Sequence, residues 1–201
     1  MLKQICKKWS LSLSIMLALL MTMVATPATA ELPDILESGK IRIAVPENFP
    51  PFGSLGEEGE YVGYDVEVAQ MIADDLGVEL ELVPVTSKQR IPFLETDKVD
   101  LVISTMGANP SRAKSINFSS AYAPFYSGVF APSSIKVSSY ADLEGLTIGV
   151  TGGTLEDLEL TKMAPKGAKI TRFGDNAATL SAIKSKQVQV LVAGNRSEER
   201  F

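Results

Sequence analysis

Short apolar runs alternate along this chain with stretches in which apolar residues recur at helical spacing. The run from Ile41 to Val45 is rich in β-branched residues and predicts a first core strand. From Val66 to Leu76 the apolar residues fall on one face of a helix, which Asp65 is expected to cap and Gly77 to end. Val78 to Val83 alternates with glutamates, which predicts a half-exposed strand. Together these stretches predict a β-α-β unit with parallel strands.

The alternation continues in two further series. A helix from about Lys88 to Glu95 leads to a buried strand from Val99 to Ile103, and an extended aromatic stretch from Phe118 to Pro132 is suited to a crossover. The second series comprises a helical turn at Tyr140 to Leu143, strands at Leu146 to Val150, Lys169 to Phe173 and Val188 to Ala193, and a helix at Asn176 to Ser185 with Leu180 and Ile183 inward. Alternating strands and helices predict an α/β fold in two halves.

The amino terminus has the pattern of an export signal. Three lysines precede an apolar run of 14 residues from Leu11 to Val24, and the small residues Ala28 to Ala30 follow it. We therefore expect cleavage after Ala30 and a periplasmic mature chain. A permanent membrane anchor is disfavoured because the run is shorter than the roughly 20 residues that cross a bilayer.

Removal of this leader limits the reactive side chains that the mature chain contains. The single cysteine, Cys6, leaves with it, and the chain has no histidine, so a thiol nucleophile, a disulfide and an imidazole base are all excluded from the mature chain. We expect no cofactor and no metal. Without the three leader lysines, 16 basic residues stand against 24 acidic ones, a net charge of −8. Nucleic acid and anionic membrane surfaces are poor partners for such a chain.

Small polar residues follow the Val99 strand directly. Ser104, Thr105 and Gly107 lead to a proline-marked turn at Pro110 and then to Arg112. Hydroxyls, open backbone and a guanidinium at the carboxyl end of a parallel strand are the groups that bind a carboxylate or another anion. The alternative is an ordinary loop with a solvated arginine.

Two other loops sit at strand ends. Gly152 and Gly153 precede Thr154, which with Asp157 forms a capping arrangement at a helix start, where backbone N–H groups favour an anion. The alternative is a plain capped helix; a Walker phosphate loop is excluded because its lysine is missing. Phe49 and Phe52 lie among prolines after the first strand and are suited to the wall of a pocket, or else to capping the edge of a core.

Six blocks of sequence carry a resemblance to a known family: IRIAV…FPPF, VGYDVEVA, RIPFL…KVDLVIST, SRA…INFSSAY, LEGLTIGVTGGT and KQVQVLVA. Between Leu32 and Gly194 the chain resembles the periplasmic solute-binding proteins that deliver polar amino acids to ABC importers (family 3, type II periplasmic-binding fold). The resemblance implies a monomeric, non-enzymatic binding protein whose partners are an amino acid and an inner-membrane ABC permease. It also implies a signal peptide at 1–30, a first lobe at 31–123 and a second lobe at 124–201.

The resemblance also implies roles for individual residues. Arg112 would grip the ligand carboxylate with help from Thr105 and the N–H of Gly107, and Thr154 with Gly153 would complete this site from the second lobe. The pocket wall and neighbouring positions would be Phe49, Phe52, Ser87, Ser104, Met106 and Asn195, and the hinge would be Ala123, Pro124, Phe125 and Tyr126. Family members commonly carry an acidic residue for the ligand ammonium where this chain has Gly194, which puts recognition of a free α-amino group in question.

The family pattern continues beyond the end of this sequence. We therefore expect the second lobe and the return crossover to be incomplete. Two alternatives to transport remain open on the same fold. One is an exported enzyme resembling prephenate or arogenate dehydratases, for which Glu156 and Asp157 are the nearby acids, although helix amino-terminal charges explain them better. The other is a solute-sensing domain.

Overall fold

The computed structural model describes residues 32–124 and 126–194, all of which belong to one compact unit, Glu31–Phe201. The expected signal peptide and its cleavage site, Phe125 of the expected hinge and Asn195 of the expected site lie outside the described residues. Within them, no helix has both the length and the apolar character to cross a membrane.

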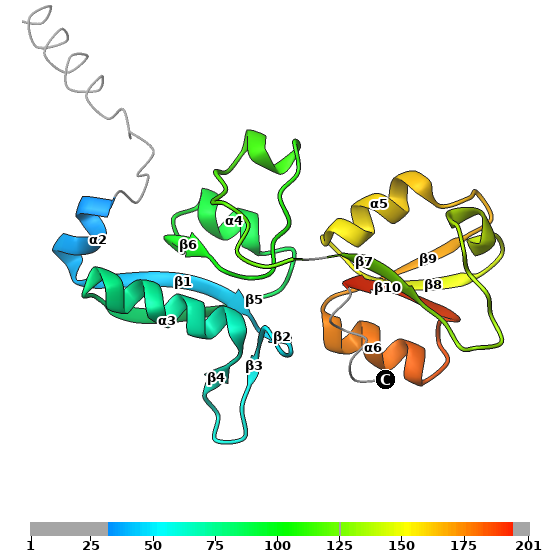
Figure 1. Cartoon of the computed structure of the whole chain (residues 1–201), viewed down its shortest axis with the longest axis horizontal. Coiled ribbons are helices and arrows are strands. Elements are labelled where there is room, and N and C mark those ends of the chain that lie inside the picture. The colour runs from blue at the N-terminus through cyan, green and yellow to red at the C-terminus, as the bar shows by residue number, and fades with distance from the viewer. Residues whose placement is uncertain (1–31, 125, 195–201) are drawn as a thin grey trace, which may run out of the picture. The chain divides into compact units, whose positions relative to one another are not determined.

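The first sheet is parallel and confirms the predicted β-α-β unit. Its strands are β1 (Lys40–Pro46), β5 (Glu79–Val85) and β6 (Leu101–Val102), in the order β5-β1-β6. The helices of this part are α2 (Leu32–Ser38), α3 (Tyr64–Leu76) and α4 (Arg90–Glu95). Figure 1 shows α3 lying along β1 and β5. Strand β6 is shorter than the stretch from Val99 to Ile103 that the sequence predicts.

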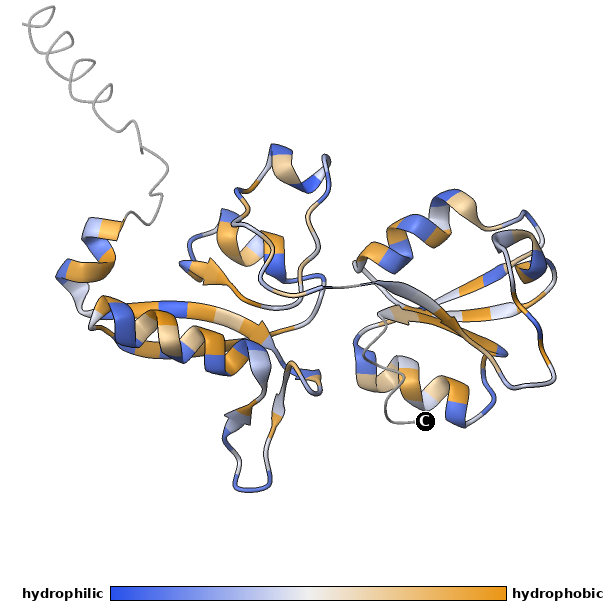
Figure 2. Ribbon diagram, viewed as in Figure 1, coloured by the Kyte–Doolittle hydropathy of each residue, from blue (hydrophilic) through white to orange (hydrophobic). Residues whose placement is uncertain are grey.

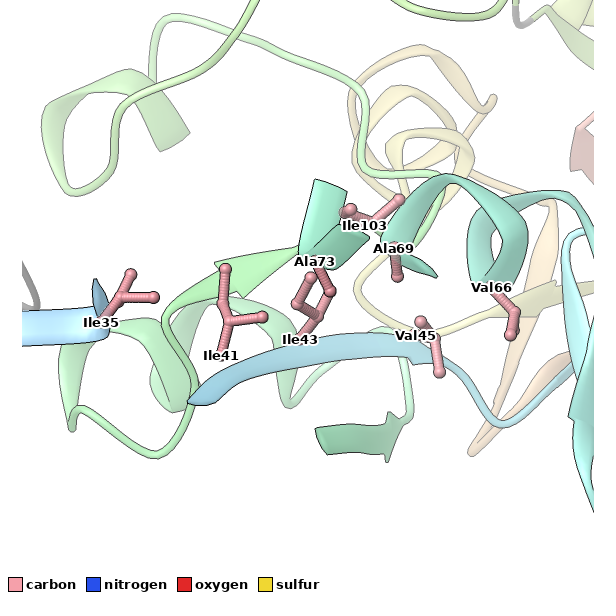
Figure 3. Close-up of a cluster of buried hydrophobic side chains, with 8 residues drawn as sticks. All are labelled: Ile35, Ile41, Ile43, Val45, Val66, Ala69, Ala73 and Ile103. Carbon is pink, nitrogen blue, oxygen red and sulfur yellow. The ribbon is translucent and has the colours of Figure 1, made fainter. Parts of the chain in front are cut away.

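Strand β1 is buried on both faces, which explains its continuous apolar run. On one face Ile41, Ile43 and Val45 pack in the cluster that includes Val66, Ala69 and Ala73 of α3 (Figure 3). On the other face Ala44 packs with Val85 and Val99, and the side chains of Phe93 and Leu94 from α4 lie against them. The core of this part is therefore a three-layer sandwich of helix, sheet and helix.

The start of α3 differs from the prediction. The N-cap is Gly63, whose φ of 133° favours glycine, and Asp65 lies within the first helical turn with its side chain fully buried. The prediction that Asp65 caps this helix was wrong, because its carboxylate accepts hydrogen bonds from distant parts of the chain. Gly77 ends α3 in a left-handed conformation, as predicted.

The chain segment that connects β1 to α3 forms a small antiparallel sheet. It consists of β2 (Asn48–Phe49), β3 (Gly53–Leu55) and β4 (Tyr61–Val62). These strands were not predicted, since strands of two or three residues among prolines and glycines leave no alternation of apolar and polar residues.

The second sheet has four strands in the order β7-β10-β8-β9. They are β7 (Ser127–Phe130), β8 (Thr147–Thr151), β9 (Lys169–Phe173) and β10 (Val190–Gly194), with β7 antiparallel to β10 and the other pairs parallel. Helices α5 (Leu155–Met163) and α6 (Asn176–Lys184) cover opposite faces of this sheet (Figure 1). Two 3-10 turns, η1 (Arg112–Lys114) and η2 (Tyr140–Leu143), complete the elements described.

The core of the second sheet is apolar and follows the predicted strands. It contains Leu143, Ile148, Val150, Leu160, Val190 and Val192. Hydrophobic and hydrophilic residues alternate around α6 (Figure 2). Its fully buried positions are Thr179 and Ala182, whereas Leu180 and Ile183, which the sequence placed inward, are half-buried. Thr179 is accommodated because its hydroxyl donates to the Asp175 carbonyl, at 2.7 Å.

Candidate functional site

The loop after β6 carries a buried guanidinium, that of Arg112. Only 8% of this residue is exposed. Its Nη1 donates to the Gly107 carbonyl at 2.7 Å, and its Nη2 donates to the Gly153 carbonyl at 2.9 Å. Burial lowers the pKa of Arg112, and the charge of Glu156 acts in the opposite direction. The predicted alternative of a solvated arginine is therefore wrong.

A turn places Arg112 at this position. The Asn109 side-chain oxygen accepts from the backbone N–H groups of Ser111 and Arg112, each at 2.9 Å, and η1 begins there. Gly107 lies against the Leu155 side chain of α5 so closely that a Cβ at position 107 would collide with it. A side chain at position 107 would therefore require the Leu155 side chain of α5 to move.

A second buried guanidinium, that of Arg90, was not predicted from the sequence. Arg90 is the first residue of α4 and is 4% exposed. It donates to three backbone carbonyls: to Ser104 at 2.7 Å, to Ser87 at 3.1 Å and to Gly153 at 3.4 Å. Burial, and next the charge of Arg112, lower its pKa to about 10, so it stays a cation at neutral pH. The sequence did contain a signal for this burial. A cation in the first turn of a helix is unfavourable next to the helix dipole unless other groups bind it.

The loop after β8 is held by residues of its own helix. Thr154 caps α5, as predicted: its hydroxyl accepts from the Asp157 N–H at 3.2 Å and donates to the Thr151 carbonyl at 2.9 Å. The Gly153 N–H was predicted to be open to an anion, but it donates to the Asp157 carboxylate at 3.0 Å. Arg172 of β9 holds the other oxygen of that carboxylate at 2.7 Å. The Gly153 carbonyl faces the two buried guanidinium groups.

Glu156 brings a buried carboxyl to the same region. It is 3% exposed, and burial raises its pKa, while a hydrogen bond from its own backbone N–H lowers it. Its charge also interacts favourably with Arg90. The site therefore combines two guanidinium groups with one acid of shifted pKa.

These side chains line a pocket that is open to solvent. Among its lining residues are six from the predicted site, namely Phe49, Ser87, Thr105, Gly107, Arg112 and Thr154. Gly194, the residue where the resemblance led us to expect an acid, lines it as well. The lining residues that the sequence did not predict are Arg90, Thr151, Leu155, Asn176, Val192 and Ala193, and Glu156 was weighed only as a possible acid.

Three other predicted residues line neighbouring hollows. Ser104 lines a smaller one beside Phe49 and Ser87. Phe52 and Met106 line a larger, apolar hollow, together with Ala123 and Pro124 of the expected hinge. Tyr126 is exposed and lines none of these three.

Four aromatic rings form a continuous row beside these hollows. Phe49 and Phe52 stack with centroids 5.2 Å apart, Phe52 meets Tyr64 edge-on at 6.4 Å, and Tyr64 stacks on Tyr122 at 6.1 Å. Both phenylalanines are buried, and Phe49 lines the main pocket while Phe52 lines the apolar hollow. The rings therefore belong both to the edge of the core and to the walls of these hollows.

Over the described ranges there is no cluster of three or more His, Cys, Asp or Glu residues that could hold a metal ion.

Comparison with known proteins identifies the class to which this fold and pocket belong. The family model of the bacterial extracellular solute-binding proteins, family 3, matches residues 41–190, and the chain belongs to this family. This result confirms the predicted two-lobed α/β fold of the type II periplasmic-binding class.

Individual relatives are consistent with this family assignment. The chain is 31% identical over 172 residues to a glutamine-binding protein of Geobacillus stearothermophilus, covering 83% of this chain and 65% of that protein. The holo structure of the arginine-binding protein ArgBP from T. maritima matches with a TM-score of 0.79 and 32% identity, over 84% of this chain and 75% of that one. An ancestral amino acid-binding protein, AncCDT-1, described as a precursor of cyclohexadienyl dehydratase, matches with a TM-score of 0.77 and 30% identity, over 81% of this chain and 73% of that one. The chain thus spans about two thirds of the length of the glutamine-binding relative.

Proposed function

We propose that this chain binds a polar amino acid, or a similar small carboxylate, in the pocket at Arg112 and delivers it to an ABC importer of the inner membrane. It would act in the periplasm as a monomer after loss of its leader. Family membership and the names of the relatives, which bind glutamine and arginine, support this role. The observation that carries the proposal is the buried guanidinium of Arg112 at a pocket that Thr105, Gly107 and Thr154 also line.

The energetics of such a site are adequate. A hydrogen bond to a charged group contributes about 1.5–3 kcal/mol, and micromolar affinity corresponds to roughly 8 kcal/mol. Two or three such bonds around one carboxylate therefore supply much of the binding free energy. The Arg112 guanidinium has more donors than the two that the Gly107 and Gly153 carbonyls take, so it can serve both the loop and a ligand.

Binding would be coupled to closure of the two proposed lobes, 31–123 and 124–201. The contacts from Arg90 and Arg112 to the Gly153 carbonyl already link the two halves of the chain. A ligand that touches both loops favours the closed state, and the chain would bend at the proposed hinge near Ala123 to Tyr126.

The test is a thermal-shift screen of the purified chain against the common amino acids. We expect at least one polar amino acid to raise the melting temperature. Arg112→Ala should abolish that rise, with an affinity loss of about 100-fold, because the carboxylate loses its charged partner. Lys114→Ala is the matched control, since Lys114 is an exposed cation in the same 3-10 turn. An unchanged rise in Arg112→Ala would refute the site.

The exported dehydratase is not favoured. The family and the names of its members point to binding, and Glu156 lies in the first turn of α5, where the helix dipole favours a carboxylate. Two observations nevertheless keep the dehydratase as the second candidate. Glu156 places an acid of raised pKa in the pocket, and the chain resembles a protein described as a dehydratase precursor. A turnover assay with prephenate separates the two functions: binding without turnover supports the proposal, and turnover that Glu156→Gln abolishes would replace it.

A further inference from the structure

One peptide group, that between Ser104 and Thr105, lies between two buried side chains of opposite charge. Its carbonyl accepts from Nη1 of Arg90 at 2.7 Å, and its N–H donates to Oδ2 of Asp65 at 2.9 Å. Asp65 is fully buried and Arg90 is 4% exposed. Asp65 comes from α3 and Arg90 from α4, so two separate helices hold opposite ends of this peptide.

The peptide needs this support because the backbone at Thr105 is strained. Thr105 has a φ of 46°, in the left-handed region that β-branched residues rarely adopt. Hydrogen bonds to charged groups are among the strongest in proteins, so Asp65 and Arg90 oppose this strain. They hold the chain in the turn that carries Thr105 and Gly107 to the lining of the pocket.

Asp65 also reaches the segment before the expected hinge. Its Oδ1 accepts from the Tyr122 hydroxyl at 3.1 Å, and Tyr122 in turn stacks on Tyr64. The titratable groups that face the Asp65 carboxylate are thus Tyr122, through this hydrogen bond, and Arg90, through its charge. Burial raises the pKa of Asp65 to about 6, while the bonds from Tyr122 and Thr105 and the charge of Arg90 oppose this rise.

We propose that Asp65 and Arg90 are positioning residues that orient the Ser104–Thr105 peptide for ligand binding, and that protonation of Asp65 weakens binding. Protonation turns the ionic acceptor of the Thr105 N–H into a neutral one, so the strained turn is held less firmly. Neither residue needs to touch the ligand. The part of this inference that concerns affinity rests on the proposed function.

The stability of the chain should respond to Asp65 in the opposite direction. The folded-state pKa of about 6 lies above the ordinary aspartate value of 3.8, so the contribution of this group to stability is complete below about pH 3.8 and is lost as the pH rises through 6. Acidification from pH 7.5 to 5 therefore strengthens the fold through this residue while it weakens ligand binding. A residue with a purely structural role would not change the stability of the fold and the affinity for the ligand in opposite directions.

The first test needs no ligand. In the ¹⁵N-labelled chain, the backbone amide of Thr105 should titrate with a midpoint near pH 6, because its acceptor gains a proton there. Asp65→Asn should remove the titration, and Asp75→Asn, an exposed carboxylate on the same helix, should leave it unchanged. Tyr122→Phe should move the midpoint upward, since it deletes a hydrogen bond that favours the ionised form. A Thr105 amide that does not move between pH 4.5 and 7.5, or that moves equally in Asp65→Asn, overturns the proposal.

The second test measures affinity for L-glutamine and L-arginine at pH 7.5 and 5. If the bound state lowers the pKa of Asp65 by one unit, Kd should rise roughly fivefold on acidification. Asp75→Asn should behave like the unaltered chain, whereas Asp65→Asn should bind more weakly at pH 7.5 and show little change with pH. Affinity that does not fall on acidification overturns the coupling. Absence of binding by either amino acid counts against the proposed function, while the Thr105 amide still decides whether Asp65 holds the peptide.

Discussion

The two strand-end loops at the candidate site are built in opposite ways. The loop after β8 is fixed by near neighbours, since Thr154 caps its own helix and Asp157 accepts from the Gly153 N–H four residues away. The loop after β6 is fixed from a distance: Thr105 donates to Asp65, 40 residues earlier in the chain, and Ser104 accepts from Arg90, 14 residues earlier. The loop after β8 is held mainly by contacts within its own helix start, with long-range contacts only at the Gly153 carbonyl, whereas the loop after β6 is held by buried charges from two distant helices.

This difference determines how strongly a substitution destabilises each loop. Capping is a modest and local contribution, so its loss frays one helix end. A buried guanidinium that serves several carbonyls cannot be replaced by water, so its loss leaves polar groups without partners. The loop after β6 should therefore be the more sensitive of the two to a single substitution.

The largest effect is expected for Arg90→Met. The substitution keeps much of the volume of the side chain but leaves the Ser87 and Ser104 carbonyls without their donor, and it removes a further contact to Gly153. We expect the free energy of unfolding to fall by about 3 kcal/mol, measured by urea denaturation. Lys166→Met is the control, because Lys166 is exposed and belongs to the second half. A loss below about 1 kcal/mol would show that Arg90 does not hold the loop.

A smaller effect is expected for Thr154→Ala. The alanine cannot accept from the Asp157 N–H, so α5 loses its cap and unfolding should become easier by about 1 kcal/mol. Thr154→Ser keeps the hydroxyl and should retain most of the stability. Equal losses in the two variants would point to the methyl group of Thr154, and the contrast between the two loops would not hold.

The same contrast explains how much of the structure the sequence predicted. The cap at Thr154, the end of α3 at Gly77 and the turn at Tyr140 to Leu143 depend on local chemistry and agree with the predictions. Asp65 was misread as a cap because the local pattern permits one, whereas its actual partners are Thr105 and Tyr122.

Arg90 illustrates the other limit of the sequence. Its neighbours suggest an exposed cation near a helix start, and only the packing of α4 against the loop after β6 buries it. Arg112 could be singled out because it follows a strand end and its small polar residues, a pattern that sequence alone reveals. Arg90 left only a weak signal in the sequence, a cation in the first turn of a helix, because its burial depends on packing between distant segments.

The central claim, a carboxylate held by Arg112, is tested most directly by calorimetric titration. The amino acid with the largest thermal shift would be compared with its own α-carboxamide, in the unaltered chain and in Arg112→Ala. We predict that the carboxamide binds the unaltered chain at least about 50-fold more weakly, and that Arg112→Ala binds the two ligands equally. A carboxamide that binds the unaltered chain as tightly as the free amino acid would contradict the account.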